Sequence, residues 1–227
     1  MRVLVSDNLG EVGIRMLEAE DGIDVDVKTG LSPEALKDII GEYHALIIRS
    51  ATKVTEDLLS AANRLKVVGR AGIGLDNVDI PAATRRGVVV MNTPDGNVIT
   101  TAEHAIAMMM ALARNIPQAT ASMREGKWEK KLLTGVEITG KTLGIIGLGH
   151  IGRVVAERAL GLKMKVVASD PFVSPEAAKQ LHVELMPLEE LLPASDFITL
   201  HVPRLKETIG MINAELIAKM KPGVRII

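Results

Sequence analysis

The feature that most constrains this chain is a glycine pattern formed by Gly147, Gly149 and Gly152, which fits G-x-G-x-x-G. The apolar run 142–146 precedes it and a helical pattern opens at Arg153, so the glycines lie between a predicted strand and a predicted helix. There the first glycine permits a tight turn, the second lets the backbone approach a pyrophosphate, and the third allows close helix–strand packing. The helix N-terminus then faces the negative charge. The segment predicts a dinucleotide-binding unit.

An acidic residue stands where such a unit binds the ribose. The segment 165–169 is typical of a second strand, and Asp170 follows it 18 positions after Gly152, close to the roughly 20 expected. A carboxylate accepts hydrogen bonds from the 2′-hydroxyl of NAD and repels a 2′-phosphate, so NAD is favoured over NADP. The alternative is that the glycines serve only turns and Asp170 only caps the next helix. The ordered strand, helix, strand and acid favour the first interpretation.

Short apolar segments alternate with helical patterns along the rest of the chain. The predicted strands are 2–6, 23–27, 45–50, 65–71, 88–92, 142–147, 165–170, 196–202 and 223–227. Ser32-Pro33 and Thr55-Glu56 are typical helix starts. Alternation at this spacing predicts an α/β protein with parallel sheets covered by helices on both faces.

We expect two doubly wound parallel-sheet domains, 1–95 and 96–227, joined by a helix over about 100–115. The last predicted strand coincides with Ile227, and a buried parallel strand is normally followed by a covering helix. The second domain is therefore expected to be incomplete at its C-terminus.

Composition excludes several classes of function. With 47% hydrophobic and 24% charged residues the chain can bury a core, and its formal net charge of -1 gives no electrostatic support for binding nucleic acid or membranes. The absence of cysteine excludes disulfides, thiolate metal sites and cysteine nucleophiles. The five histidines lack a zinc-binding spacing, so no metal site is predicted. The N-terminus lacks a secretory signal pattern, which favours a cytoplasmic location.

Two arginines follow predicted strands of the first domain. Arg49-Ser50 ends one strand, and Arg70 ends the next, just before Gly72 and Ile73. Ligands of open α/β sheets bind beyond the carboxyl ends of strands, where an arginine can fork to a carboxylate or phosphate and glycine-flanked amides can bind an anion. The residues alone favour the alternative that each arginine pairs with a nearby acid. Four aspartates are interpreted as caps or turn residues: Asp7, Asp76, Asp79 and Asp95.

An ordered set of segments resembles the D-isomer-specific 2-hydroxyacid dehydrogenases over nearly the whole chain. These segments are 48–55, 68–79, 92–97, 101–104, 126–129 and 140–147. The resemblance implies a flavodoxin-like substrate domain, built mostly from 1–95, and an NAD-binding Rossmann domain, with the substrate in the cleft between them. It implies NAD-dependent oxidation of D-3-phosphoglycerate to 3-phosphohydroxypyruvate, the first step of L-serine biosynthesis.

The resemblance also assigns residues to each ligand. The substrate would contact Arg49, Ser50, Arg70, Gly72 and Ile73. NAD would contact Ile73, Gly147, Gly149, His150, Ile151, Gly152, Asp170, Val202 and Pro203. Ile73 stands where members with this substrate often have threonine, and His150 where they commonly have arginine. Because both contacts are partly made by the backbone, cofactor binding should survive these departures.

No catalytic residue is assigned within the 227 residues. The proton-transferring histidine, the glutamate that orients it and the substrate-binding arginine of the family are expected beyond Ile227, so this chain alone is expected to show negligible turnover. The alternatives are a glyoxylate/hydroxypyruvate reductase or another D-2-hydroxyacid dehydrogenase, and an NAD-sensing protein of the corepressor type.

The resemblance implies a homodimer formed through the 100–130 region, and a tetramer stays open. Trp128 lies in this region and is expected at the interface, although it could equally be an ordinary core tryptophan. Met108, Met109 and Met110 are interpreted as core or subunit-contact residues.

Overall fold

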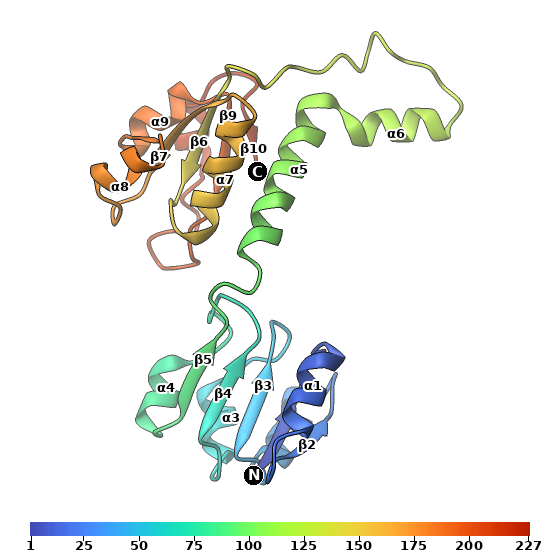
Figure 1. Ribbon diagram of the computed structural model, residues 1–227, viewed down its shortest axis with the longest axis vertical. Helices are drawn as coiled ribbons and strands as arrows, with labels where there is room; N and C mark the ends of the chain where they lie inside the picture. The colour runs from blue at the N-terminus through green and yellow to red at the C-terminus, as the bar shows by residue number, and fades with distance from the viewer. The chain divides into compact units, whose positions relative to one another are not determined.

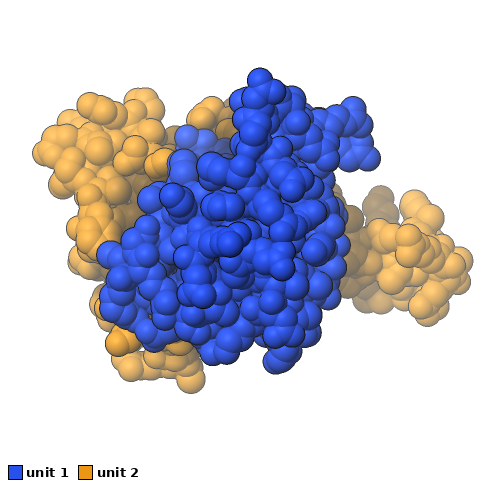
Figure 2. Space-filling model, turned by 90° about the horizontal axis from the view of Figure 1, so that it is seen from below, with its two compact units in different colours: residues 1–97 blue, residues 98–227 orange.

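Parallel strands form two separate sheets, one in each of two compact units, residues 1–97 and 98–227 (Figure 2). The computed structural model describes all residues from 1 to 227. The predicted fold class, α/β with two doubly wound parallel sheets, is confirmed. None of the helices combines the length and apolar character that crossing a membrane requires.

Unit 1 is a five-stranded sheet in the order β2-β1-β3-β4-β5, which is the flavodoxin-like order (Figure 1). Its elements are β1 (Arg2–Val5), α1 (Glu11–Glu18), β2 (Asp24–Val27), α2 (Pro33–Ile40), β3 (Ala45–Ile48), α3 (Glu56–Ala61), β4 (Val67–Arg70), α4 (Ile80–Arg85) and β5 (Val89–Asn92). All five predicted strands occur. β3 ends at Ile48, so Arg49 and Ser50 belong to the loop that follows the strand.

The core of unit 1 lies under α2, α3 and α4. α2 contacts α3, and α3 contacts α4. Right-handed crossovers that follow one another in the same direction along a sheet place their helices side by side on one face. Leu46, Ile48 and Val68 are fully buried beneath them. The two predicted helix starts are observed, because the hydroxyl of Ser32 accepts the Ala35 amide and that of Thr55 accepts the Leu58 amide.

Unit 2 begins with α5 (Val98–Arg114) and α6 (Ile116–Arg124) and continues into a second five-stranded parallel sheet. The remaining elements are β6 (Thr142–Ile146), α7 (His150–Gly161), β7 (Lys165–Ser169), α8 (Pro175–Gln180), β8 (Glu184–Leu185), α9 (Leu188–Ala194), β9 (Phe197–Leu200), α10 (Ala214–Ala218) and β10 (Arg225–Ile226). Their order in the sheet is β10-β9-β6-β7-β8. The chain leaves the central strand β6 in one direction and returns to it on the other side at β9.

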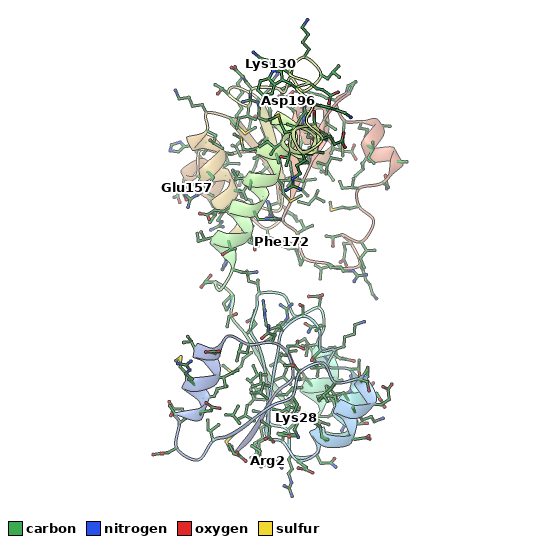
Figure 3. All side chains as sticks on the ribbon, turned by 90° about the vertical axis from the view of Figure 1, so that its right-hand side faces the viewer. Arg2, Lys28, Lys130, Glu157, Phe172 and Asp196 are labelled. Carbon is green, nitrogen blue, oxygen red and sulfur yellow. The ribbon has the colours of Figure 1, made fainter.

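Both faces of this second sheet are covered. On one face α5 packs against α7, and Met109 and Val155 are buried between these helices and the sheet. On the other face Leu191 and Leu192 of α9 form a separate core. At the amino ends of the strands, Asp196 accepts the Thr142 amide at 2.9 Å and so joins β9 to β6 (Figure 3).

Two features of unit 2 differ from the predictions. The predicted helix 100–115 is α5, but a second helix, α6, follows it directly because Asn115 adopts a left-handed conformation with φ 52°. α6 points away from the sheet, and the segment after it runs back to β6 (Figure 1). The edge strand β8 has two residues and was not predicted.

Candidate functional site

The glycine loop lies at the point where the strand order of unit 2 reverses, between β6 and β9. Gly147 has φ +94°, and a Cβ built on it would lie 2.6 Å from the His201 carbonyl oxygen at the end of β9. A Cβ on Gly152 would lie 2.1 Å from the Gly147 carbonyl oxygen. Only glycine fits either position, so these two residues are required by the turn and by the packing of α7 on the loop.

Gly149 is different, because nothing in the protein requires it to be glycine. A Cβ at this position would meet no atom within 4 Å, and its φ of -75° is open to any residue. The backbone amide of Gly149, which precedes the twelve-residue helix α7, donates to no group of the protein. The missing side chain therefore leaves open surface and a free donor at a helix N-terminus, which is the cradle that a pyrophosphate requires.

Asp170 follows β7 and joins this strand to the glycine loop. One carboxylate oxygen accepts the Leu148 amide at 2.8 Å, and the other accepts the Phe172 amide at 2.8 Å. The next helix, α8, is capped instead by Ser174, so the interpretation of Asp170 as a helix cap is wrong. Each carboxylate oxygen can accept more than one hydrogen bond, which leaves Asp170 able to receive ribose hydroxyl groups as well.

The segment after β9 lies against the glycine loop. A Cβ on Gly147 would also lie 2.8 Å from the Val202 side chain, so Val202 borders the loop directly, and Pro203 follows it at the surface. The His201 ring contacts the Thr199 hydroxyl at 3.0 Å, and burial lowers the pKa of this imidazole below its usual range. A neutral histidine held by a neighbouring hydroxyl fits a structural role.

The second candidate region lies at the carboxyl ends of β3 and β4 in unit 1. Arg49 and Ser50 are exposed, and Arg70 is half-buried. The Arg49 guanidinium donates to the Asn8 carbonyl at 3.3 Å, and that of Arg70 to the Arg49 carbonyl at 3.3 Å. Neither arginine forms an ion pair with a carboxylate, so the alternative favoured by the residues alone is wrong. Two arginines that form no ion pair stand at adjacent strand ends.

The glycine-flanked turn beside Arg70 presents a free donor. The carbonyl oxygens of Gly72 and Ile73 are occupied, the first by the Thr93 amide at 3.1 Å and the second by the Asn92 side chain at 2.7 Å. The Ile73 amide donates to no group of the protein. The turn is thereby fixed with an N–H available for an anion.

Sequence reasoning missed two residues that organise this region, Asp7 and Asn77. Asp7 does not cap α1, whose N-cap is Gly10, so its interpretation as a cap is wrong. Its carboxylate instead binds the loop that carries Arg49. Asp79 does cap a helix, α4, by accepting the Ala82 amide at 2.9 Å. The hydrogen bonds of Asp7 and Asn77 join residues more than twenty positions apart, so no local pattern could have revealed the roles of these two residues.

A parallel sheet that carries a glycine cradle, a helix N-terminus and an acid after the second strand defines a dinucleotide-binding α/β protein. Residues 106–227, more than half of the chain, match the family model described as D-isomer specific 2-hydroxyacid dehydrogenase, NAD binding domain. The chain belongs to the D-isomer-specific 2-hydroxyacid dehydrogenase family, and its cofactor is NAD.

The most similar curated proteins share one name and come from distant organisms. The whole chain is 54% identical to D-3-phosphoglycerate dehydrogenase of Synechocystis sp., 52% to that of Archaeoglobus fulgidus and, over 226 residues, 50% to that of Homo sapiens. It covers 40%, 43% and 42% of these relatives. The chain thus spans about two fifths of the length of the curated relatives it matches.

Solved structures agree with the fold. A protein from Thermus thermophilus superposes with a TM-score of 0.91 at 35% identity, covering 100% of this chain and 72% of that one. D-lactate dehydrogenase from Aquifex aeolicus, solved with NAD and lactic acid, gives a TM-score of 0.88 at 29% identity, covering 100% of this chain and 68% of that one.

Proposed function

We propose that this chain supplies the substrate-binding and NAD-binding part of an enzyme that catalyses the NAD-dependent oxidation of D-3-phosphoglycerate to 3-phosphohydroxypyruvate, the first step of L-serine biosynthesis. The full-length enzyme, with the proton-transferring residues that this chain lacks, is called the intact protein below. The observation that carries the proposal is the pair of arginines, Arg49 and Arg70, that stand at adjacent strand ends of unit 1 and donate to carbonyl oxygens rather than forming ion pairs. A phosphorylated hydroxy acid has two anionic groups, whereas lactate or glycolate has one. Sequence identity of about one half to relatives named D-3-phosphoglycerate dehydrogenase supports the same substrate.

The chain's own residues would bind and orient the two reactants. Arg49, Ser50 and Arg70 would hold the substrate's anionic groups, with the Gly72–Ile73 turn donating its free amide. Gly147, Gly149, His150, Ile151 and Gly152 would receive the pyrophosphate, Asp170 the ribose, and Ile73, Val202 and Pro203 the remaining NAD contacts. NAD bound by these residues would supply the acceptor for the hydride from C2 of the substrate.

Initial rates on the intact protein test the substrate assignment. We expect kcat/KM for D-3-phosphoglycerate to exceed that for D-lactate by about tenfold to a hundredfold, because D-lactate has no phosphate and a charge-assisted arginine–phosphate contact contributes roughly 1.5–3 kcal/mol. Arg49→Gln should remove most of this preference. A larger kcat/KM for glyoxylate than for 3-phosphohydroxypyruvate would instead indicate a glyoxylate reductase. NADH binding with no turnover of any acid would indicate an NAD-sensing protein.

We also propose that the protein is a homodimer formed through the 100–130 region. This region has an apolar surface that covers nothing within the chain: Met108, Leu112, Ile116, Met123 and Trp128 are all exposed. Trp128 is 78% exposed, so it is not a core tryptophan. Exposed large apolar side chains on two successive helices and the loop after them support a subunit interface here.

A further inference from the structure

The loop that carries Arg49 and Ser50 is held on one side by Asp7. This carboxyl group follows β1 and is 7% exposed. Its Oδ2 accepts the Arg49 amide at 2.6 Å and the Thr52 amide at 3.1 Å, and its Oδ1 accepts the Thr52 hydroxyl at 2.7 Å. No lysine or arginine pairs with it, so the negative charge of Asp7 is balanced by hydrogen bonds from the loop.

Asn77 holds the same loop from the other side. Its Nδ2 donates to the Arg49 carbonyl oxygen at 2.7 Å and to the Thr52 carbonyl oxygen at 2.6 Å. Its Oδ1 is buried and has no partner, which is rare for a polar atom in a folded protein. Turning the amide over would set its oxygen against two carbonyl oxygens. The orientation of the Asn77 amide is therefore fixed by its two bonds to the loop, which leave its oxygen unpaired.

Asp7 and Asn77 act on the same two residues in complementary ways. Asp7 accepts from the amides of Arg49 and Thr52, and Asn77 donates to their carbonyl oxygens. The loop between these two residues lacks support from a packed core, because a cavity of about 350 Å³ lies against it, lined in part by Asp7, Ala51 and Thr52. Directed hydrogen bonds are what fix the loop.

We propose that Asp7 and Asn77 are positioning residues that set the direction in which Arg49 and Ser50 face the anionic substrate. The proposal rests on the proposed function, which gives Arg49 and Ser50 their role. Neither positioning residue needs to touch substrate or NAD. Their contribution should appear as substrate affinity that depends on Arg49.

The first test is Asn77→Ala in the intact protein. We expect KM for D-3-phosphoglycerate to rise about tenfold, as for the loss of two hydrogen bonds, with a smaller change in kcat and less than a twofold change in Kd for NADH. Ser32→Ala is the matched control, since it removes the α2 cap elsewhere in unit 1 and destabilises the fold with KM unchanged. An unchanged KM in folded Asn77→Ala protein, or an equal rise in the control, overturns the proposal.

A double-mutant cycle separates this proposal from the function on which it rests. If Asn77 acts through Arg49, Asn77→Ala should raise KM less than twofold when Arg49→Gln is already present. Multiplicative effects would overturn the positioning role. Arg49→Gln without effect on KM would overturn the proposed function instead. Thr52→Val tests the Asp7 side without removing its charge. It deletes the 2.7 Å contact of the Thr52 hydroxyl with Asp7 together with its 2.9 Å contact with the Ser6 hydroxyl, and it should raise KM with Kd for NADH unchanged.

Discussion

The carboxylate of Asp170 and the backbone amide of Leu148 are joined by a 2.8 Å hydrogen bond. Leu148 lies between two glycines of the loop, so the residue expected to select the ribose also fixes the loop expected to receive the pyrophosphate. Because the two are connected, a change at Asp170 should affect affinity for the whole cofactor as well as the choice between NAD and NADP.

Replacing Asp170 should therefore separate these two effects. Asp170→Asn keeps an oxygen for the Leu148 amide but removes the charge that repels a 2′-phosphate, so the preference for NADH over NADPH should fall about tenfold. Asp170→Ala also frees the loop and should raise Kd for both cofactors. Fluorescence titration with each reduced cofactor measures this, and an unchanged ratio in Asp170→Asn protein would contradict the ribose assignment.

The glycine loop offers a matched pair of substitutions. Gly149→Ala adds a methyl group to open surface, so Tm should change little while Kd for NADH rises about tenfold or more. Gly152→Ala drives a Cβ to 2.1 Å from the Gly147 carbonyl oxygen and should destabilise the fold by about 1–3 kcal/mol. Thermal unfolding and NADH titration of both variants check the contrast. A loss of stability in Gly149→Ala equal to that in Gly152→Ala would refute it.

The sequence predicts those parts of the fold that depend on local patterns. Strands buried on both faces are continuous apolar runs, and the starts of α2 and α3 have a capping hydroxyl at Ser32 and Thr55. The edge strand β8 escapes prediction because Glu184 and Leu185 are too few to form a run. The second helix α6 escapes although Pro117 stands in its first turn, because the break between α5 and α6 is the single left-handed residue Asn115.

The candidate site is less predictable than the fold. Gly149 and Asp170 are found from spacing, because a dinucleotide fixes the distance between them along the chain. Asp7 and Asn77 are not, because each meets Arg49 only after β1, β3 and the segment before α4 have come together in space. The unpaired state of Arg49 and Arg70 is equally invisible in sequence, since it depends on where every carboxylate of unit 1 lies.

Asp7 should also make the protein sensitive to acid. Burial opposes ionisation of this group, yet hydrogen bonds from Thr52, Arg49 and Ala51 outweigh it and lower the pKa of Asp7 below its usual range. A lowered pKa in the folded state stabilises the protein above the unfolded value, roughly pH 3.9, and this stability is lost as pH falls through the folded pKa.

The matched comparison is Asp7→Asn against the parent protein in denaturant unfolding between pH 7 and pH 3. The free energy of unfolding should be higher for the parent at neutral pH, and the difference should shrink as the pH falls below about 4. The subtraction removes the contributions of other acids, such as Asp26 and Asp196, whose pKa values are also lowered. A difference in unfolding free energy that does not depend on pH would mean that the charge of Asp7 does not contribute to stability.

Trp128 should contribute most to subunit association. The loop that carries it is fixed to α6, because the Ser122 hydroxyl donates to the Glu129 carboxylate at 2.7 Å and the Lys127 amide to the Ser122 carbonyl at 2.9 Å. The indole is thus presented to solvent by an ordered backbone rather than packed in a core.

Trp128→Ala should weaken the dimer at least about thirtyfold, as removal of a buried interface tryptophan costs roughly 2 kcal/mol or more. Sedimentation across a concentration series measures this. Phe172→Ala is the aromatic control, since Phe172 is 93% exposed at the far end of β7 (Figure 3) and should leave association unchanged. A folded Trp128→Ala protein that stays dimeric at the parent's affinity would exclude this surface as the interface.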